Sequence, residues 1–238
     1  MHQWRFIDDG PATGAANMTR DERLLAEAQA GNPVPVLRFY GWDPPTVSLG
    51  RFQKEETAID RKACEARGIG IVRRITGGRA VLHDRELTYS IISPANHPLF
   101  PNDVLGTYRV IGQGLLAGFQ NLGVAAEMVS RSGRHAGLVE KDAKAPSCFA
   151  SPSWYEIVVK GRKIVGSAQR RVGGAFLQHG SILIAYDPVA EAAVIRGGGA
   201  AHAITSLKEI LNRDVGLAEV REAFREGFRA ALGIAFLP

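Results

Sequence analysis

The sequence contains only two cysteines, Cys64 and Cys148, among its 238 residues. They form no CxxC pair and have no Cys/His spacing typical of zinc ligands, which argues against both a zinc site and a disulfide framework. No apolar run approaches the ~20 residues needed to span a bilayer. The N-terminal stretch MHQWRFIDDG lacks the apolar segment of a secretory signal. We therefore expect a cytoplasmic protein without a metal, a cofactor or a membrane partner.

A strong excess of one charge is also missing, since 29 Lys and Arg residues stand against 24 Asp and Glu residues. Such a small and dispersed excess does not indicate nucleic-acid binding, although it agrees with an acidic protein partner or with phosphates. Internal repeats and low-complexity linkers are absent from the sequence as well. We therefore expect residues 1–238 to form one domain.

Helix-forming and β-prone segments follow one another without the regular alternation typical of a doubly wound parallel sheet. The pattern predicts helices over residues 13–30, 55–67, 102–122 and 217–232. It predicts strands over residues 36–40, 46–49, 69–75, 79–83, 87–93, 154–159, 163–169 and 176–185. This order favours an α+β fold with a mixed, mostly antiparallel sheet flanked by helices.

The stretch RRITGGRAVLHD at residues 73–84 combines three arginines with a pair of glycines. Gly77 and Gly78 lack a Cβ, so their backbone N–H groups can approach the oxygens of a ligand, and arginines add paired donors for anions. The alternative is a hairpin turn between two strands, with the charges in water. Taken alone, His83 in this stretch is typical of a packed or hydrogen-bonding histidine.

A hairpin is predicted around Lys160-Gly161, which has the composition of a two-residue turn. With that turn Val158 faces Lys163, which places Lys163 on the same sheet face as Glu156 and Trp154. Burial disfavours a charged amine and a nearby carboxylate favours it, so the sequence leaves the protonation of Lys163 open. A solvated hairpin lysine is the alternative.

Two further groups of residues interrupt apolar strands. They are Gly166, Ser167 and Ala168 in one strand, and Gln178, His179 and Gly180 in the other. Small residues inside a strand commonly mark the close approach of a ligand or of another backbone segment. Buried polar residues need hydrogen-bond partners, which can be a ligand or a satisfied core network.

The two cysteines lie in different contexts. Cys148 lies in a loop bracketed by prolines, PSCFASP, where an inert core cysteine is less expected than inside a helix or strand. Its thiolate would be a good nucleophile. Cys64 lies within a helical pattern and is expected only to pack.

Taken together, RRITGGRAVLHD, GRKIVGSAQRR and LQHGSILI resemble three ordered motifs of the biotin and lipoate protein ligase superfamily. The resemblance covers nearly the whole chain and is closer to the octanoyltransferase branch. It implies an α+β catalytic domain with a mixed sheet. It also implies transfer of an octanoyl group from acyl carrier protein through a cysteine thioester to a lysine of a lipoyl-accepting protein.

Four features favour this reaction over that of an ATP-dependent lipoate ligase. Cys148 stands where the cysteine-dependent transferases carry theirs, and it is followed by PSWYE. Gly-Gly-Arg replaces the Gly-Gly-Gly of ligases, and ELTYS replaces their Gly-Asn-x-x-Phe-Ser pattern. The chain also stops near Pro238, without the additional C-terminal domain that ligases often need. A non-catalytic relative that binds acyl groups or carrier proteins is the other alternative.

The resemblance implies Cys148 and Lys163 as the catalytic pair, with Lys163 positioning the acyl carbonyl, stabilising the oxyanion or shuttling a proton. His83 and His179 are candidate bases for the attacking amine. The expected substrate-binding residues are Arg74, Gly77, Gly78, Arg79, Ala80, His83, Gly166, Ser167, Ala168, Gln178, His179 and Gly180. Arg74 and Arg79 either face the anionic carrier or brace the loop. The expected acceptor is a lipoyl domain or the glycine cleavage H protein.

Overall fold

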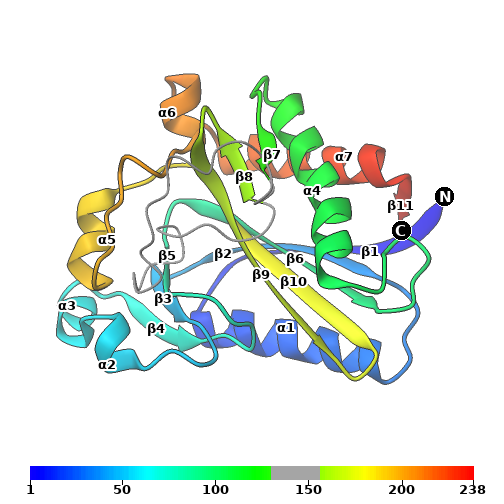
Figure 1. Cartoon of the computed structure of the whole chain (residues 1–238), viewed down its shortest axis with the longest axis horizontal. Helices are drawn as coiled ribbons and strands as arrows, with labels where there is room; N and C mark the ends of the chain where they lie inside the picture. Colours follow the sequence, from blue (N-terminus) through cyan, green and yellow to red (C-terminus); the bar gives the residue numbers. More distant parts are fainter. Residues whose placement is uncertain (130–155) are drawn as a thin grey trace.

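The computed structural model describes residues 1–129 and 156–238, and a twisted sheet of eight strands forms its centre (Figure 1). In spatial order the strands are β11 (Ile234–Phe236), β1 (His2–Ala12), β2 (Val36–Trp42), β6 (Glu86–Pro94), β10 (Ala175–Leu183), β9 (Arg162–Val172), β8 (Glu156–Val159) and β7 (Glu127–Val129). The pairs β11–β1 and β1–β2 are parallel, and the other neighbours are antiparallel. The predicted mixed, mostly antiparallel sheet is confirmed.

Helices cover both faces of this sheet (Figure 1). Helices α4 (Val104–Asn121) and α7 (Leu217–Leu232) pack against one face, and α1 (Gly14–Gln29) lies on the other. None of the helices in the described part of the chain is both long enough and apolar enough to cross a membrane.

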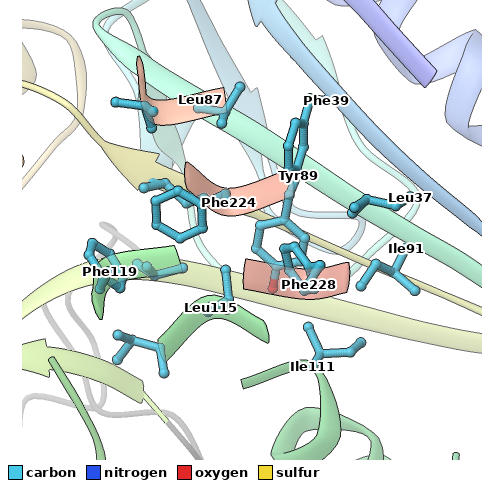
Figure 2. Packing of buried hydrophobic residues seen from close by; sticks show 14 of the residues in the cluster. Leu37, Phe39, Leu87, Tyr89, Ile91, Ile111, Leu115, Phe119, Phe224 and Phe228 are labelled. Carbon is cyan, nitrogen blue, oxygen red and sulfur yellow. The ribbon is translucent and has the colours of Figure 1, made fainter. Parts of the chain in front are cut away.

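The main apolar core lies between the sheet and the α4–α7 pair (Figure 2). Because strand residues alternate between faces, Leu87, Tyr89 and Ile91 of β6 all point into this core. They meet Phe224 and Phe228 of α7, which are fully buried. The opposite face of the same strands is consequently left for polar residues and for α1.

A smaller three-stranded sheet lies beside α1, with the order β4 (Gly70–Arg73), β3 (Thr46–Leu49) and β5 (Val81–His83). Short helices α2 (Glu55–Ala58), α3 (Arg61–Ala66) and α5 (Pro188–Val194) complete this region. Cys64 of α3 is fully buried in its apolar cluster. The prediction that Cys64 only packs is confirmed.

Two details of the predicted elements are wrong. The helix expected over residues 55–67 is broken at Ile59, which has an extended backbone, and Asp60 caps the second piece by accepting from the N–H of Ala63. Gly77 and Gly78 do not form a hairpin turn, because β3 lies between β4 and β5 and pairs with both. The glycine pair instead belongs to a loop that crosses the end of β3.

Five elements were not predicted: β1, β7, β11, α5 and α6 (Leu207–Leu211). The first of these strands contains Asp8, Asp9 and Pro11, residues that are depleted in strands. It forms nonetheless because it pairs with β2 along most of its length. The others are too short for periodicity to identify them.

Candidate active site

The hairpin that carries Lys163 forms as predicted. Lys160 and Gly161 both have positive φ, at 50° and 75°, as the turn requires, and Val158 is paired with Lys163. The Nζ atom of Lys163 donates a hydrogen bond of 2.7 Å to Oε1 of Glu156. Only 4% of Lys163 is exposed, so the alternative of a solvated lysine is wrong.

A β-bulge decides which face of the sheet Lys163 occupies. Val158 pairs with Lys163 but the preceding Ile157 pairs with Val165, so β9 has one extra residue, Ile164, at this point. Ile164 and Val165 both belong to the main apolar core. Without the bulge, strict alternation would direct Lys163 into that core as well. The bulge therefore moves the amine to the opposite, polar face.

Beyond the bulge, the small residues of β9 continue along that face. Gly166 pairs with Ser181 and Ala168 pairs with His179, and directly opposed residues of antiparallel strands share a face. Lys163 and Gly166 are therefore successive side-chain positions on one surface, at most about 10 Å apart along the strand.

A cavity with about 370 Å³ of empty space, part of it open to solvent, lies on this face. Its lining includes seven of the predicted residues: Arg74, His83, Gly166, Ser167, Ala168, His179 and Gly180. The remaining lining residues were not predicted from the sequence: Met18, Tyr40, Trp42, Ser48, Val81, Thr88 and Ser181. They come from separate elements whose strand and helix patterns read as ordinary core, so only the fold brings them together.

Arg74 braces the glycine loop. The side chain is buried, and its guanidinium donates to the carbonyls of Ser48, Gly77 and Arg79 at 2.8, 3.0 and 2.6 Å. Of the two roles considered for this arginine, the structure therefore shows the bracing one. The predicted residues Gly77, Gly78, Arg79 and Ala80 lie outside the cavity lining, and Ala80 packs in the apolar cluster of the small sheet.

The glycine loop also depends on Gly50, which no sequence motif had indicated. A Cβ at Gly50 would lie 1.9 Å from the carbonyl oxygen of Gly78. Gly78 itself has a φ of +91°, a conformation that favours glycine. A Cβ at Gly77, by contrast, would meet no heavy atom of the described chain within 4 Å.

His179 belongs to a buried ionic network. Its Nδ1 atom lies 3.2 Å from Oδ2 of Asp21, and its Nε2 atom lies 2.7 Å from the hydroxyl of Thr76. Burial alone would raise the pKa of Asp21, but the hydrogen bond and charge of His179, together with Arg38, hold that pKa below its usual value. Because the ionised carboxylate only accepts, the Nδ1 atom of His179 carries a proton. The expected core network is therefore present, and it contacts the glycine loop through Thr76.

His83 occupies the other side of the cavity. Its Nε2 atom lies 2.8 Å from the hydroxyl of Ser48, and Nδ1 lies 3.4 Å from Oε1 of Glu86. The ring stacks on that of Trp42 with a centroid distance of 4.0 Å. Burial lowers the pKa of His83 against the opposing effect of Glu86, so the imidazole is neutral near pH 7.

Gln178 points to the opposite face of the sheet. Its amide nitrogen donates 3.0 Å to the hydroxyl of Tyr89, which also lies 2.7 Å from the hydroxyl of Ser167. Burial raises the pKa of Tyr89 to about 12. These contacts satisfy Gln178 within the core, away from the cavity lining.

Two predicted residues, the nucleophile Cys148 and its neighbour Trp154, lie outside the described residues. The pairing of Cys148 with Lys163 therefore stays a prediction.

Comparisons with known proteins identify the family. Residues 13–229 match the family described as the lipoyl protein ligase A/B catalytic domain. The octanoyltransferase LipM of Kyrpidia tusciae is 44% identical over 251 residues, which span 100% of this chain and 90% of the relative. LipM of Geobacillus kaustophilus is 43% identical over 245 residues, spanning 99% of this chain and 88% of the relative.

Solved structures show the same fold. A lipoate-protein ligase A bound with ATP superposes with a TM-score of 0.81 at 26% identity, covering 100% of this chain and 88% of the other. A bi-partite lipoate protein ligase from Thermoplasma acidophilum gives a TM-score of 0.77 at 24% identity, covering 100% of this chain and 86% of the other.

The chain belongs to the lipoyl protein ligase A/B catalytic domain family. Its resemblance to the octanoyltransferase branch is confirmed, because relatives that are 41–44% identical along the full chain are octanoyltransferases. The predicted α+β fold of that family is confirmed as well.

Proposed function

We propose that this octanoyltransferase takes its acyl group from octanoyl-acyl carrier protein and passes it to a lysine of a lipoyl-accepting protein through a thioester on Cys148. The observation that carries this proposal is the placement of Lys163. It is a buried amine, held by Glu156 and turned by a bulge onto the face where Gly166 and Ala168 line a cavity. The relatives, which are themselves octanoyltransferases, support the same reaction.

In the first step the Cys148 thiolate attacks the thioester carbon, the bond to the carrier sulfur breaks, and the carrier thiolate takes up a proton. In the second step the neutral acceptor amine attacks the acyl-cysteine, and the Cys148 thiolate leaves as the amide forms. Each step passes through an oxyanion that a nearby ammonium stabilises in a water-poor site. We assign this role to Lys163, whose position Glu156 fixes.

The attacking amine must lose its proton, so a base is needed. His83 suits this role because its lowered pKa keeps it neutral, and because it lines the cavity. His179 also lines the cavity, but it makes hydrogen bonds through both ring nitrogens, to Asp21 and Thr76. Within the described residues His83 makes one, from Nε2 to Ser48, and its Nδ1 atom has no hydrogen-bond partner. We therefore favour His83 over His179 as the base.

The cavity suits an acyl chain because it has apolar walls between its polar groups. Met18, Trp42 and Val81 supply these walls. At ~0.8 kcal/mol for each buried CH₂ group, complete burial of an octanoyl chain would contribute at most about 5 to 6 kcal/mol, whereas one methylene changes binding by only ~1 kcal/mol. Chain-length preference should therefore be graded.

The acceptor is a lipoyl domain or the glycine cleavage H protein, and the protein acts in the cytoplasm as one domain over residues 1–238. The small residues of β9 form the wall beside the reacting carbonyl. The glycine loop, with Arg79 at its edge, is held by Arg74 of the cavity lining.

Intact-mass measurement after mixing the purified protein with octanoyl-acyl carrier protein tests the central step. The proposal expects a covalent octanoyl adduct that is absent in Cys148→Ala. Cys64→Ala is the matched control, since it removes the other cysteine, which is buried in α3, and should keep the adduct. Lys163→Met should slow adduct formation on the order of 100-fold, the usual loss when an oxyanion donor is removed.

Two outcomes contradict the proposal. Release of an acyl-adenylate from ATP and a free acid, without the covalent adduct, indicates a ligase. Binding of the carrier without either product indicates a non-catalytic relative.

A further inference from the structure

The turn between β3 and α2 presents one aromatic side chain to solvent. Phe52 is 83% exposed. Among the described residues, the other exposed large apolar side chains are aliphatic or Met: Met1, Val104, Leu105, Val172, Val189 and Leu237. A single exposed apolar residue is ordinary on a protein surface. Two features distinguish Phe52: hydrogen bonds fix the turn that carries it, and its neighbours are mainly basic.

Several hydrogen bonds hold the turn rigid. The N–H of Gln53 donates to the carbonyl of Gly50 at 3.0 Å, and the amide oxygen of Gln53 accepts from the N–H of Gly50 at 3.0 Å. Arg73 adds two bonds of 2.8 Å from its guanidinium to the carbonyls of Gly50 and Gln53. These hydrogen bonds hold the backbone that carries Phe52 in one conformation. Less conformational entropy is therefore lost when a partner binds to this side chain.

The same turn is joined to the glycine loop of the site. The N–H of Arg51 donates 2.9 Å to the carbonyl of Thr76, and Gly50 lies against the carbonyl of Gly78. Thr76 in turn contacts His179 of the cavity lining. A partner that rests on Phe52 is thus placed at the loop beside the cavity.

The surroundings of Phe52 are mainly basic. Arg51 lies over the Phe52 ring at 5.2 Å, and Lys54 and Arg73 lie in or beside the turn. None of the ion pairs found within residues 1–129 and 156–238 involves these three cations.

Acidic residues follow the turn at the start of α2. Glu55 is engaged by Arg61, which leaves Glu56 as the acidic neighbour. The local charge is therefore positive, and it complements an acidic surface.

We propose that Phe52, Arg51, Lys54 and Arg73 form the docking surface for the acidic carrier protein that delivers the acyl thioester. This inference rests on the proposed function. The donor fits better than the acceptor for an electrostatic reason. Both partners are expected to be acidic, but the carrier also brings a phosphodiester close to its thioester. The acceptor must bring a lysine, which a cluster of cations repels when it is protonated.

Steady-state kinetics with two donors tests this proposal. Phe52→Ala should lower kcat/KM for octanoyl-acyl carrier protein about 30-fold, the effect of an interface hot spot. With octanoyl-pantetheine, which has neither protein nor phosphate, kcat/KM should stay within about twofold, because no docking surface is involved. Val189→Ala on α5 is the matched control, since Val189 is 77% exposed and should change neither value.

Charge variants supply a second measurement. Arg51→Glu should lower kcat/KM for the carrier about tenfold at low salt, and the difference should shrink as salt rises, since screening weakens exposed charges. Equal losses with both donors in Phe52→Ala overturn the docking inference but leave octanoyl transfer intact. A loss confined to the step from acyl-enzyme to acceptor also overturns it, in favour of the acceptor. Absence of any covalent adduct in the unchanged protein contradicts the proposed function itself.

Discussion

Asp21 is expected to contribute more to stability than any surface carboxylate of this protein. Its side chain is 1% exposed and accepts hydrogen bonds on both oxygens. Oδ1 accepts from Arg38 at 2.8 Å and from Ser90 at 2.9 Å. Oδ2 accepts from Tyr40 at 3.1 Å and lies 3.2 Å from Nδ1 of His179.

Asp21→Asn keeps one of these oxygens and replaces the other with an NH₂ group. That group must face two donors, either the pair on Oδ1 or the pair on Oδ2, so about two buried hydrogen bonds are lost. The substitution also removes the buried countercharge of Arg38, whose side chain is 2% exposed. Breaking a buried ion pair in this way costs about 3–5 kcal/mol, which is a large part of the stability of a typical domain.

Urea unfolding followed by tryptophan fluorescence measures this loss. Asp9→Asn is the matched control, because Asp9 also pairs with Arg38, at 2.7 Å, but its side chain is 31% exposed. The control should lose no more than about 1 kcal/mol. A loss below about 1 kcal/mol in Asp21→Asn would refute the argument that the network holds these elements together.

The pH dependence of the free energy of unfolding gives a second check, because the direction of its change can be stated in advance. The pKa of Asp21 is lowered in the folded protein, so its contribution is present above the unfolded pKa of about 3.9. This contribution is lost as the pH falls through the lower, folded-state pKa. The difference in free energy of unfolding between the unchanged protein and Asp21→Asn should therefore become smaller below about pH 4. A difference that stays constant down to pH 3 contradicts the assigned ionisation.

Two further substitutions test the loop and the core. Gly50→Ala should cost about 1–3 kcal/mol and reduce octanoyl transfer, because the new Cβ would lie 1.9 Å from the carbonyl oxygen of Gly78. Calorimetry and the transfer rate measure this, and an unchanged Tm would contradict it, whereas Gly77→Ala should keep the Tm. Tyr89→Phe should cost about 1–3 kcal/mol by leaving the hydroxyl of Ser167 and the amide nitrogen of Gln178 without the Tyr89 hydroxyl as a partner. Thermal unfolding checks it, and a neutral result would show that those two groups find other partners.

The lysine hairpin shows what local sequence determines. A two-residue turn of Lys160-Gly161 specifies its own register, because only that geometry matches the twist of the flanking strands. The pairing of Val158 with Lys163 and the contact of Lys163 with Glu156 could therefore be predicted. The larger helices were predictable for a related reason. The helical spacing of their apolar residues and the glycines at their ends lie within one segment of the sequence.

The bulge at Ile164 and the path of the glycine loop were decided by tertiary structure. The sequence of β9 has no signal for an extra residue, yet that residue determines whether Lys163 shares a face with Val165 of the core or with Gly166 of the cavity lining. Gly77-Gly78 likewise reads as a hairpin turn, and only the insertion of β3 between β4 and β5 makes it a crossing loop. Turns and the periodic spacing of apolar residues depend on neighbours along the chain, so the sequence alone determines them. Faces, crossings and cavity walls depend on contacts between distant segments, and these exist only once the sheet has assembled.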